Sequence, residues 1–363
     1  MPRPPFPKSL IEFQSRFLDE TSCHRYLAES RWPDGFVCSA CRGTKGWEVC
    51  RRVPSRAATP APEPRTRILW ECATCGHQTS LTAGTVMQNT KLPLTVWFWA
   101  AFLVATDRRG LSALLLKRQL ALGNINSAWF LLHKLRRAMV NAQRTKLSGL
   151  VEMDGTYIGG WQPGLKGGRQ RKGRKAAMVL VAVEVRTMTR KRRNATQEMK
   201  EIAGRVRMEV ARAENAESIA TFLVKNVEPG STVRTDGLSD YVGAVGAAGC
   251  IHERKVQGRI GSGGQQVVVF AHGTIGNLKH WLNGTHHGVG RPHLQAYLDE
   301  FVFRFNRRQS PEAAFQTLLG LGSDHAHVPC NVIRHAQDLP YFYEGEEAQE
   351  QEAKKGLEGA TSW

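Results

Sequence analysis

The sequence lacks a long apolar run, and this absence limits where the protein can act. The most apolar stretch of the 363-residue chain, residues 96–105, is shorter than the roughly 20 residues that a membrane-spanning helix needs. The N-terminus, MPRPPFPKSL, has no apolar core of the kind that a secretion signal carries. We therefore expect a cytoplasmic protein with no membrane partner.

Acidic residues are also scarce. Asp and Glu total 32 against 50 Lys and Arg, which gives a formal net charge of +18. Such an excess of positive charge points to a polyanionic partner, and nucleic acid is the commonest one. We expect a protein that binds double-stranded DNA and associates with the nucleoid.

The eight cysteines are expected in a reducing compartment, where they act as thiols or metal ligands rather than disulfides. Four of them form two C-x-x-C motifs that are separated by thirty residues: Cys38 and Cys41, then Cys72 and Cys75. Four thiolates with this spacing predict a tetrahedral zinc site, which a small β-rich ribbon needs in order to fold. Cys50 and His77 remain possible substitute zinc ligands. Cys23 is predicted to be a buried thiol.

Two segments flank or interrupt this ribbon. Residues 8–30 show helical apolar periodicity and are predicted to form one helix that packs on the ribbon. Residues 51–67 are rich in Pro, Ala and Arg and lack apolar periodicity, so they are predicted to form a mobile insertion.

An aromatic helix is predicted over residues 94–106, followed by two helices within residues 110–139 that meet at Gly123 and Asn124. This arrangement resembles a helix-turn-helix, in which the second helix enters the major groove of DNA. That helix ends in three basic residues that are candidates for DNA contact: Lys134, Arg136 and Arg137. An ordinary helical hairpin is the alternative.

Two short strands carry the candidate catalytic carboxylates. Residues 151–160 place Asp154 near the centre of a β-branched run, and residues 232–235 lead directly to Asp236. Carboxylates that converge can hold divalent cations about 3.5–4 Å apart, one for the attacking oxygen and one for the leaving oxygen. The pattern predicts phosphodiester chemistry with Mg²⁺ or Mn²⁺. Glu152, on the same strand face as Asp154, is an additional candidate ligand.

A glycine-rich basic loop follows the first of these strands. Between positions 165 and 193 the chain has eleven Lys or Arg and one acidic residue, Glu184. A solvated loop is the ordinary interpretation of such a run, but beside a metal site it suits a nucleic-acid backbone. Three of its residues are candidates for DNA contact: Lys172, Arg174 and Lys175.

The order of elements predicts the fold class. Strands over residues 151–160, 176–186 and 205–210 precede a helix over residues 217–226, and the strand before Asp236, a small helix and a last strand complete the series. This is the order expected of an α/β, ribonuclease H-like fold. A zinc ribbon and a helix-turn-helix segment precede it.

Four ordered motifs resemble the DDE-type transposases of bacterial insertion sequences, specifically the ISXO-like group with an N-terminal zinc ribbon. They are VEMDGTYIGG, TDGLSDY, GTHHGV and HLQAYLDEFVFRFNRR, and the resemblance covers about residues 10–310. In that family a third metal-binding residue, often Glu or Asn, lies seven positions before a Lys. The resemblance therefore implies the set Asp154, Asp236, His272 and Lys279, with Lys279 contacting a phosphate or a terminal base.

The residue at the third position is a histidine, which departs from the family pattern of Glu or Asn. Because imidazole suits Mg²⁺ poorly and Mn²⁺ better, this departure bears on the choice of metal. His272 occupies this position, and Asn277 is the nearby alternative. The expected domains are a zinc ribbon with its helix (8–90), a helix-turn-helix segment (91–145), the catalytic domain (146–310) and a disordered acidic tail (340–363).

The resemblance implies a transposase that binds terminal inverted repeats, cleaves DNA and transfers strands to target DNA as a homodimer or higher oligomer. Two alternatives belong to other classes. One is a non-enzymatic DNA-binding regulator or inactive domesticated transposase, and the other is a ribonuclease H-like nuclease without strand transfer.

Overall fold

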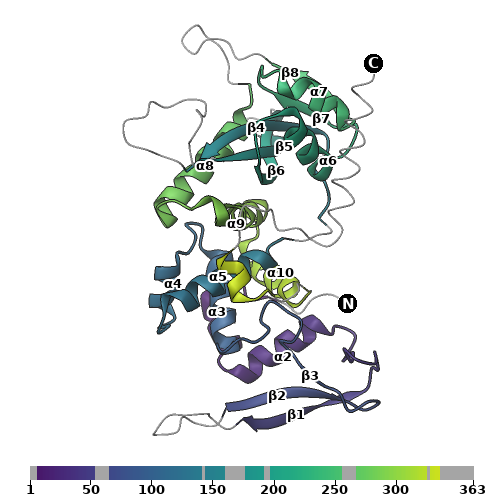
Figure 1. Cartoon of the computed structure of the whole chain (residues 1–363), viewed down its shortest axis with the longest axis vertical. Helices are drawn as coiled ribbons and strands as arrows, with labels where there is room; N and C mark the ends of the chain where they lie inside the picture. The colour runs from purple at the N-terminus through teal and green to yellow at the C-terminus, as the bar shows by residue number, and fades with distance from the viewer. Residues whose placement is uncertain are drawn as a thin grey trace. The chain divides into compact units, whose positions relative to one another are not determined.

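The computed structural model describes residues 6–53, 65–140, 144–159, 176–191, 197–255, 267–324 and 328–335, and the chain divides into two compact units (Figure 1). The first unit is formed by Met1–Val140 and Ser310–Ile333. The second is formed by Asn141–Gln309 and Arg334–Trp363. The chain thus returns to its first unit at Ser310.

Two helices, not one, open the first unit. Helix α1 spans Leu10–Arg16 and α2 spans Glu20–Arg31, so the single helix predicted over residues 8–30 is wrong. Asp19 causes the break, because its side chain accepts the backbone N–H of Ser22 at 2.8 Å while the Ser22 side chain reaches back to Asp19. This reciprocal capping box starts a new helix at Glu20.

The ribbon is a three-stranded antiparallel sheet with the order β1-β2-β3, formed by β1 (Gly46–Val53), β2 (Arg65–Cys72) and β3 (Gln78–Ser80). Strands β1 and β2 pair as far as Val53 and Arg65. Both ends of the expected mobile insertion, residues 51–53 and 65–67, therefore belong to paired strands, which corrects that prediction. Its remainder, residues 54–64, lies outside the described residues.

Helices complete the first unit: α3 (Leu94–Thr106), α4 (Ala113–Gln119), α5 (Ile125–Ala138), α10 (Pro311–Asp324) and α11 (Cys330–Arg334). Phe315 of α10 lies at the centre of an aromatic cluster, with ring centroids 5.6–6.2 Å from those of Phe13, Phe17, Tyr26, Phe98 and Phe102. A segment that follows residues 141–309 of the second unit therefore completes the core of the first. Within the described parts of the chain, no helix has the length and apolarity to cross a membrane.

The second unit is built on a five-stranded mixed sheet with the order β6-β5-β4-β7-β8. Its strands are β4 (Leu150–Ile158), β5 (Ala177–Lys191), β6 (Gln197–Ala211), β7 (Thr232–Thr235) and β8 (Ile251–Arg254). Strands β4 to β6 are antiparallel neighbours, whereas β7 and β8 run parallel to β4. The α/β fold class and the ribonuclease H-like strand order are thus confirmed.

Helices cover both faces of this sheet (Figure 1). One face carries α6 (Ala216–Asn226) and α7 (Asp240–Ala247), and the other carries α8 (Val269–His286) and α9 (Leu294–Asn306), which the short helix η1 (Arg291–His293) precedes. Successive residues of β5 alternate between the two cores: Val179 packs with α8 and α9, and Leu180 packs with α6 and α7. This alternation explains why the strand is continuously apolar.

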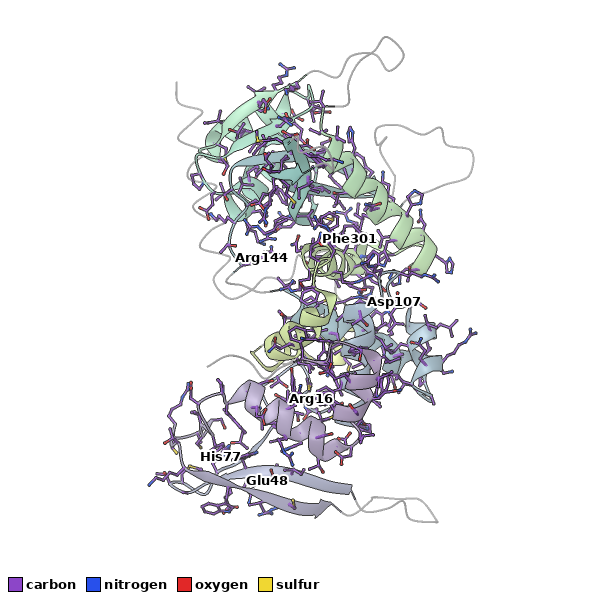
Figure 2. The ribbon with its side chains drawn as sticks, turned by 180° about the vertical axis from the view of Figure 1, so that it is seen from behind. Arg16, Glu48, His77, Asp107, Arg144 and Phe301 are labelled. Atoms are coloured by element: carbon purple, nitrogen blue, oxygen red, sulfur yellow. The ribbon has the colours of Figure 1, made fainter. Side chains whose placement is uncertain are left out.

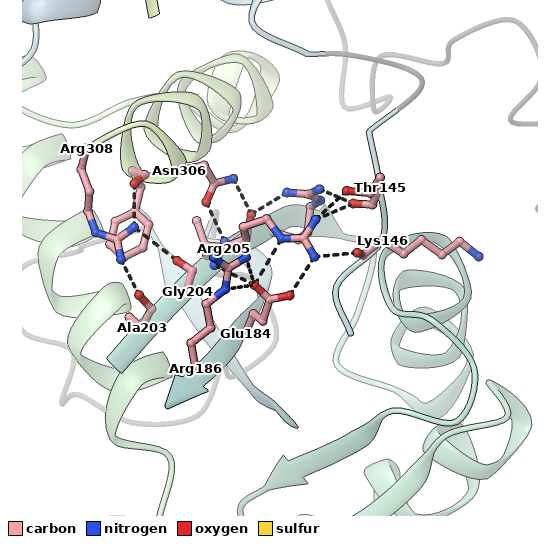
Figure 3. A network of polar contacts seen from close by, with 12 residues as sticks. Thr145, Lys146, Glu184, Arg186, Ala203, Gly204, Arg205, Asn306 and Arg308 are labelled. Carbon is pink, nitrogen blue, oxygen red and sulfur yellow. Dashed lines mark hydrogen bonds and ion pairs between the residues drawn. The ribbon is translucent and has the colours of Figure 1, made fainter. Parts of the chain in front are cut away.

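A polar network ties the sheet edge to the chain segments beside it (Figure 3). The Glu184 carboxylate of β5 accepts hydrogen bonds from Arg186 and Arg205 at 2.8 and 2.7 Å. Arg205 also donates to the backbone carbonyl of Lys146 at 2.9 Å. Burial alone would raise the pKa of Glu184, but the two guanidinium groups outweigh it and lower this pKa to about 2.

Candidate active site

The four predicted zinc ligands meet at one point of the ribbon. The sulfur atoms of Cys38, Cys41, Cys72 and Cys75 all lie within 4.8 Å of one another. The Sγ atoms of Cys38 and Cys75 are 3.7 Å apart, and those of Cys41 and Cys72 are 3.6 Å apart. A tetrahedral zinc ion with Zn–S bonds of about 2.3 Å separates its sulfurs by about 3.8 Å. The cluster therefore fits zinc.

Backbone amides face the sulfurs of Cys38, Cys41 and Cys72, while the neighbouring sulfurs raise the pKa of Cys75. The N–H groups of Ala40, Gly43 and Thr74 each lie 3.4 Å from a cysteine sulfur. Hydrogen bonds from the backbone of Cys75 and Thr74 lower the pKa of Cys72 to about 6. The thiolate is the form that binds zinc.

The other cysteine candidates lie outside this cluster. Cys50 is exposed on β1, and neither it nor His77 joins the four sulfurs. Cys23 is fully buried, and burial raises the pKa of its thiol to about 12. The predicted zinc ligands thus come together without a substitute, and Cys23 is a buried thiol as expected.

Sheet topology aligns the two candidate carboxylates. Strands β4 and β7 are parallel neighbours, with Glu152 opposite Arg234. Asp154 and Asp236 each follow this pair by two residues, and Asp236 is the first residue after β7. Backbone N–H groups hold both side chains, with Gly155 donating to Asp154 at 2.8 Å and Leu238 donating to Asp236 at 3.2 Å.

Helix α8 brings a third group to this pair. The His272 Nε2 atom lies 3.1 Å from Oδ2 of Asp154. The hydrogen bond to Asp154 raises the pKa of His272 above its usual value, and Asp236 contributes to the same shift. Both side chains are partly accessible, with 33% of His272 and 16% of Asp154 exposed. Both side chains are therefore accessible to solvent.

The other two residues of the expected set also lie on α8 and are exposed. Lys279 is two turns beyond His272, about 20° away around the helix axis, so it shares the same face. Asn277 is five residues beyond His272 and about 140° away around the axis. The structure brings His272 to Asp154 and points Asn277 elsewhere.

Glu152 has a function that sequence reasoning missed. Its Oε2 atom accepts the backbone N–H groups of Phe270 at 2.7 Å and Ala271 at 3.0 Å, in the first turn of α8. Its Oε1 atom lies 3.6 Å from the Arg234 guanidinium. The side chain is 1% exposed, and burial raises its pKa. Strand alternation predicted the face that Glu152 occupies, but no local signal predicted its partner.

The three candidate DNA-binding residues on α5 differ in how exposed they are. Lys134 is buried, with Nζ 6.0 Å from the centroid of the Trp97 ring, and Arg136 is only 1% exposed. Arg137 is half-buried. The structure thus leaves Arg137 as the most accessible of the three basic residues on this helix. The other candidates, Lys172, Arg174 and Lys175, lie outside the described residues.

A ribonuclease H-like sheet that aligns two aspartates, together with a four-cysteine ribbon, defines the class of DDE-type transposases. Comparison with protein families agrees with this class. Residues 146–306 match the ISXO2-like transposase domain, and residues 18–78 match the transposase zinc-ribbon domain. The chain therefore contains an ISXO2-like transposase domain and a transposase zinc-ribbon domain, and both domains imply that it binds DNA. No curated protein matches the chain.

Proposed function

We propose that the protein is an insertion-sequence transposase that binds terminal inverted repeats, cleaves DNA strands and transfers them to target DNA. One observation carries this proposal. Asp154 and Asp236 are aligned on neighbouring parallel strands, and His272 lies 3.1 Å from Asp154. This arrangement lies within the matched ISXO2-like domain.

The donor set fits a divalent cation. Asp154 and Asp236 provide hard carboxylate oxygens, and His272 provides an imidazole nitrogen, a combination that suits Mn²⁺ and, less well, Mg²⁺. When bound, such ions activate the attacking oxygen and stabilise the leaving oxygen of a phosphodiester. The 3.1 Å distance between His272 Nε2 and Asp154 Oδ2 supports a shared ion site for these two side chains.

The remaining residues of the site would position helix α8 and bind the DNA. Glu152 holds the first turn of α8 against β4, and so keeps His272 opposite Asp154. Lys279, exposed on the His272 face of the helix, would bind a phosphate of the DNA strand. Water would attack the phosphodiester first, and the freed 3′-hydroxyl would then attack target DNA at the same site.

DNA binding would use both units. We assign recognition of the repeats to the zinc ribbon and the α4–α5 helix pair, with Arg137 at the protein surface. Lys172, Arg174 and Lys175 would neutralise backbone phosphates of the DNA. The net charge of +18 supports this assignment. A homodimer or higher oligomer would hold two repeat ends together.

A second candidate function rests on His272. Because imidazole replaces the usual carboxylate or amide ligand, a non-enzymatic DNA-binding regulator or an inactive domesticated transposase is the alternative. A nuclease that cleaves without strand transfer is a third. These functions differ in the products formed from a repeat end and target DNA.

The test is cleavage and strand transfer on DNA that carries the element's repeat, with Mg²⁺ or Mn²⁺. Asp154→Asn and Asp236→Asn should each abolish both reactions and leave repeat binding intact, because they remove metal ligands rather than DNA contacts. Asp240→Asn, four residues beyond Asp236 in α7, is the matched control and should stay active. An active Asp236→Asn protein would contradict the proposal.

A further inference from the structure

Strand β8 forms one edge of the five-stranded sheet and pairs with β7, the strand that leads to Asp236 (Figure 1). Asp236 is the first residue after β7, and the chain turns there before α7 begins. Within this turn the backbone N–H of Leu238 donates to Oδ1 of Asp236 at 3.2 Å. Two side chains of β8 make further hydrogen bonds to the same turn.

The first connection runs from His252 to Asp236 through Thr235. The Nε2 atom of His252 lies 2.8 Å from Oγ1 of Thr235, and this hydroxyl donates to the backbone carbonyl of Asp236 at 3.0 Å. A threonine hydroxyl has one proton to donate. Because that proton goes to the Asp236 carbonyl, the hydroxyl accepts the other bond and His252 Nε2 is its donor. The imidazole ring thus orients the hydroxyl, and the hydroxyl holds the peptide group of Asp236.

Burial makes the hydroxyl of Thr235 dependent on these two partners. The Thr235 residue is 0% exposed, so water does not replace a lost partner, and an unpaired buried hydroxyl destabilises the fold. Strand alternation places it on the sheet face of Val233, which packs with α6 and α7. Phe301 packs on the opposite face (Figure 2). The hydrogen-bonded chain therefore lies within the packed layer that supports the turn.

The second connection comes from Arg254. Its Nη2 atom donates to the backbone carbonyl of Gly237 at 2.6 Å. His252 and Arg254 are alternate residues of β8, so they share one face of the strand. Glu253, between them, points the other way and pairs with Arg234 at 3.1 Å. One face of β8 is thus directed at the turn, with the buried bond through Thr235 as its main contact because Arg254 is exposed to competing water.

We propose that His252, acting through Thr235, is a positioning residue that holds the Asp236 carboxylate ready for a divalent cation. A ligand that is already ordered does not lose conformational freedom when the ion binds, so its affinity is higher. The inference rests on the proposed function for the role of Asp236 as a metal ligand. The ordering of the turn by β8 can be measured without any metal at the site.

The first test measures this ordering by hydrogen–deuterium exchange on the zinc-loaded full-length protein, without Mn²⁺ or Mg²⁺. Thr235→Val keeps the branched shape but removes the hydroxyl, so a peptide covering residues 236–239 should exchange about tenfold faster, as expected for one lost hydrogen bond. Thr235→Ser keeps a hydroxyl and should exchange slowly, as wild type does. Thr232→Val, at the start of the same strand, is the matched control. Unchanged exchange in Thr235→Val, or equally fast exchange in Thr235→Ser, would overturn the proposal.

The second test measures Mn²⁺ binding to the same variants by calorimetry, without DNA. Thr235→Val should bind Mn²⁺ about tenfold more weakly than wild type, while Thr235→Ser and Thr232→Val should keep wild-type affinity. A merely structural role would lower the melting temperature and leave this affinity unchanged. Asp236→Asn separates the two proposals: if it binds Mn²⁺ as wild type does, the proposed metal site is wrong. If Asp236→Asn binds weakly but Thr235→Val does not, only the positioning role is overturned.

Variants of His252 keep the proposal testable if Thr235→Val does not fold. His252→Leu removes the donor, so it should speed up exchange of residues 236–239 and weaken Mn²⁺ binding as Thr235→Val does. His252→Gln carries an amide N–H that can replace Nε2, and should stay near wild type. His280→Leu, which changes an exposed histidine of α8, is the matched control. Wild-type exchange and affinity in His252→Leu would overturn the proposal.

Discussion

Glu152 Oε2 accepts the backbone N–H of Phe270 at 2.7 Å, so a residue of the central strand caps a helix that begins well over one hundred residues later. Helix α8 needs this external cap, because Val268 at its N-cap position provides no side-chain hydrogen bond. The first N–H groups of a helix have no partner within it, and the helix dipole favours a carboxylate there. The strand of Asp154 therefore holds the helix of His272.

We predict that Glu152→Ala raises the metal concentration needed for half-maximal cleavage at least tenfold, because α8 no longer holds His272 opposite Asp154. The free energy of unfolding should fall by about 1–3 kcal/mol, the cost of leaving buried donors unpaired. Glu152→Gln, whose amide oxygen can still accept, should be milder. Cleavage is titrated with Mn²⁺, and repeat binding is measured in parallel.

The matched control for this prediction is Glu201→Ala. Glu201 is 49% exposed and lies 3.9 Å from Arg234, so its loss removes a carboxylate near the same guanidinium without touching α8. It should leave metal dependence unchanged. If Glu152→Ala also left it unchanged, packing alone would hold α8 in place.

The metal preference of the site should follow His272. We expect wild type to cleave better with Mn²⁺ than with Mg²⁺, and His272→Glu to restore Mg²⁺ use, because a carboxylate oxygen suits Mg²⁺ better than an imidazole nitrogen does. Asn277→Ala should be tolerated, since Asn277 points away from Asp154. A tolerated His272→Ala with an inactive Asn277→Ala would assign the ligand to Asn277 instead. Cleavage of a pre-cut repeat end with each metal measures all three variants.

The ribbon should hold about one zinc per chain. Cys38→Ser and Cys72→Ser should lose it and unfold the ribbon, because both sulfurs also belong to the small core with Phe36. Cys50→Ser, an exposed cysteine outside the cluster, should keep the metal. Elemental analysis and near-ultraviolet circular dichroism measure both effects, and a folded, metal-free ribbon would contradict the prediction.

Acid should weaken the second unit through Glu184. Its pKa of about 2 in the folded protein lies below the usual 4.5, so the ionised form stabilises the fold above pH 4.5, and this contribution is lost as the pH falls towards 2. The shift corresponds to about 3 kcal/mol. Glu184→Gln should therefore lower the free energy of unfolding at pH 7, and its difference from wild type should shrink between pH 4.5 and 2. Glu217→Gln, which removes an exposed carboxylate in α6, is the control.

Features that depend on local spacing could be predicted from the sequence. The spacing of the two C-x-x-C motifs predicted a four-cysteine zinc site, and the four sulfur atoms lie within 4.8 Å of one another. The order of strands and helices likewise predicted the ribonuclease H-like sheet. In that sheet Asp154 lies on β4, and Asp236 directly follows β7, the parallel neighbour of β4.

Features that depend on distant partners could not be predicted in this way. Basic residues in a helix look alike in sequence whether they face solvent or core, yet Lys134 and Arg136 are buried while Arg137 is partly exposed. Phe315 completes a core whose other members precede it by more than two hundred residues.

The sequence by itself determined which residues can bind metal and the order of the elements that carry them. Only the tertiary structure decided that Glu152 caps α8 and that His272, not Asn277, reaches Asp154. Ligand spacing and strand periodicity depend on neighbouring residues in the chain. The position of α8, in contrast, depends on a buried carboxylate in another element, and the rotation of each residue around the helix then decides which side chain meets the aspartates.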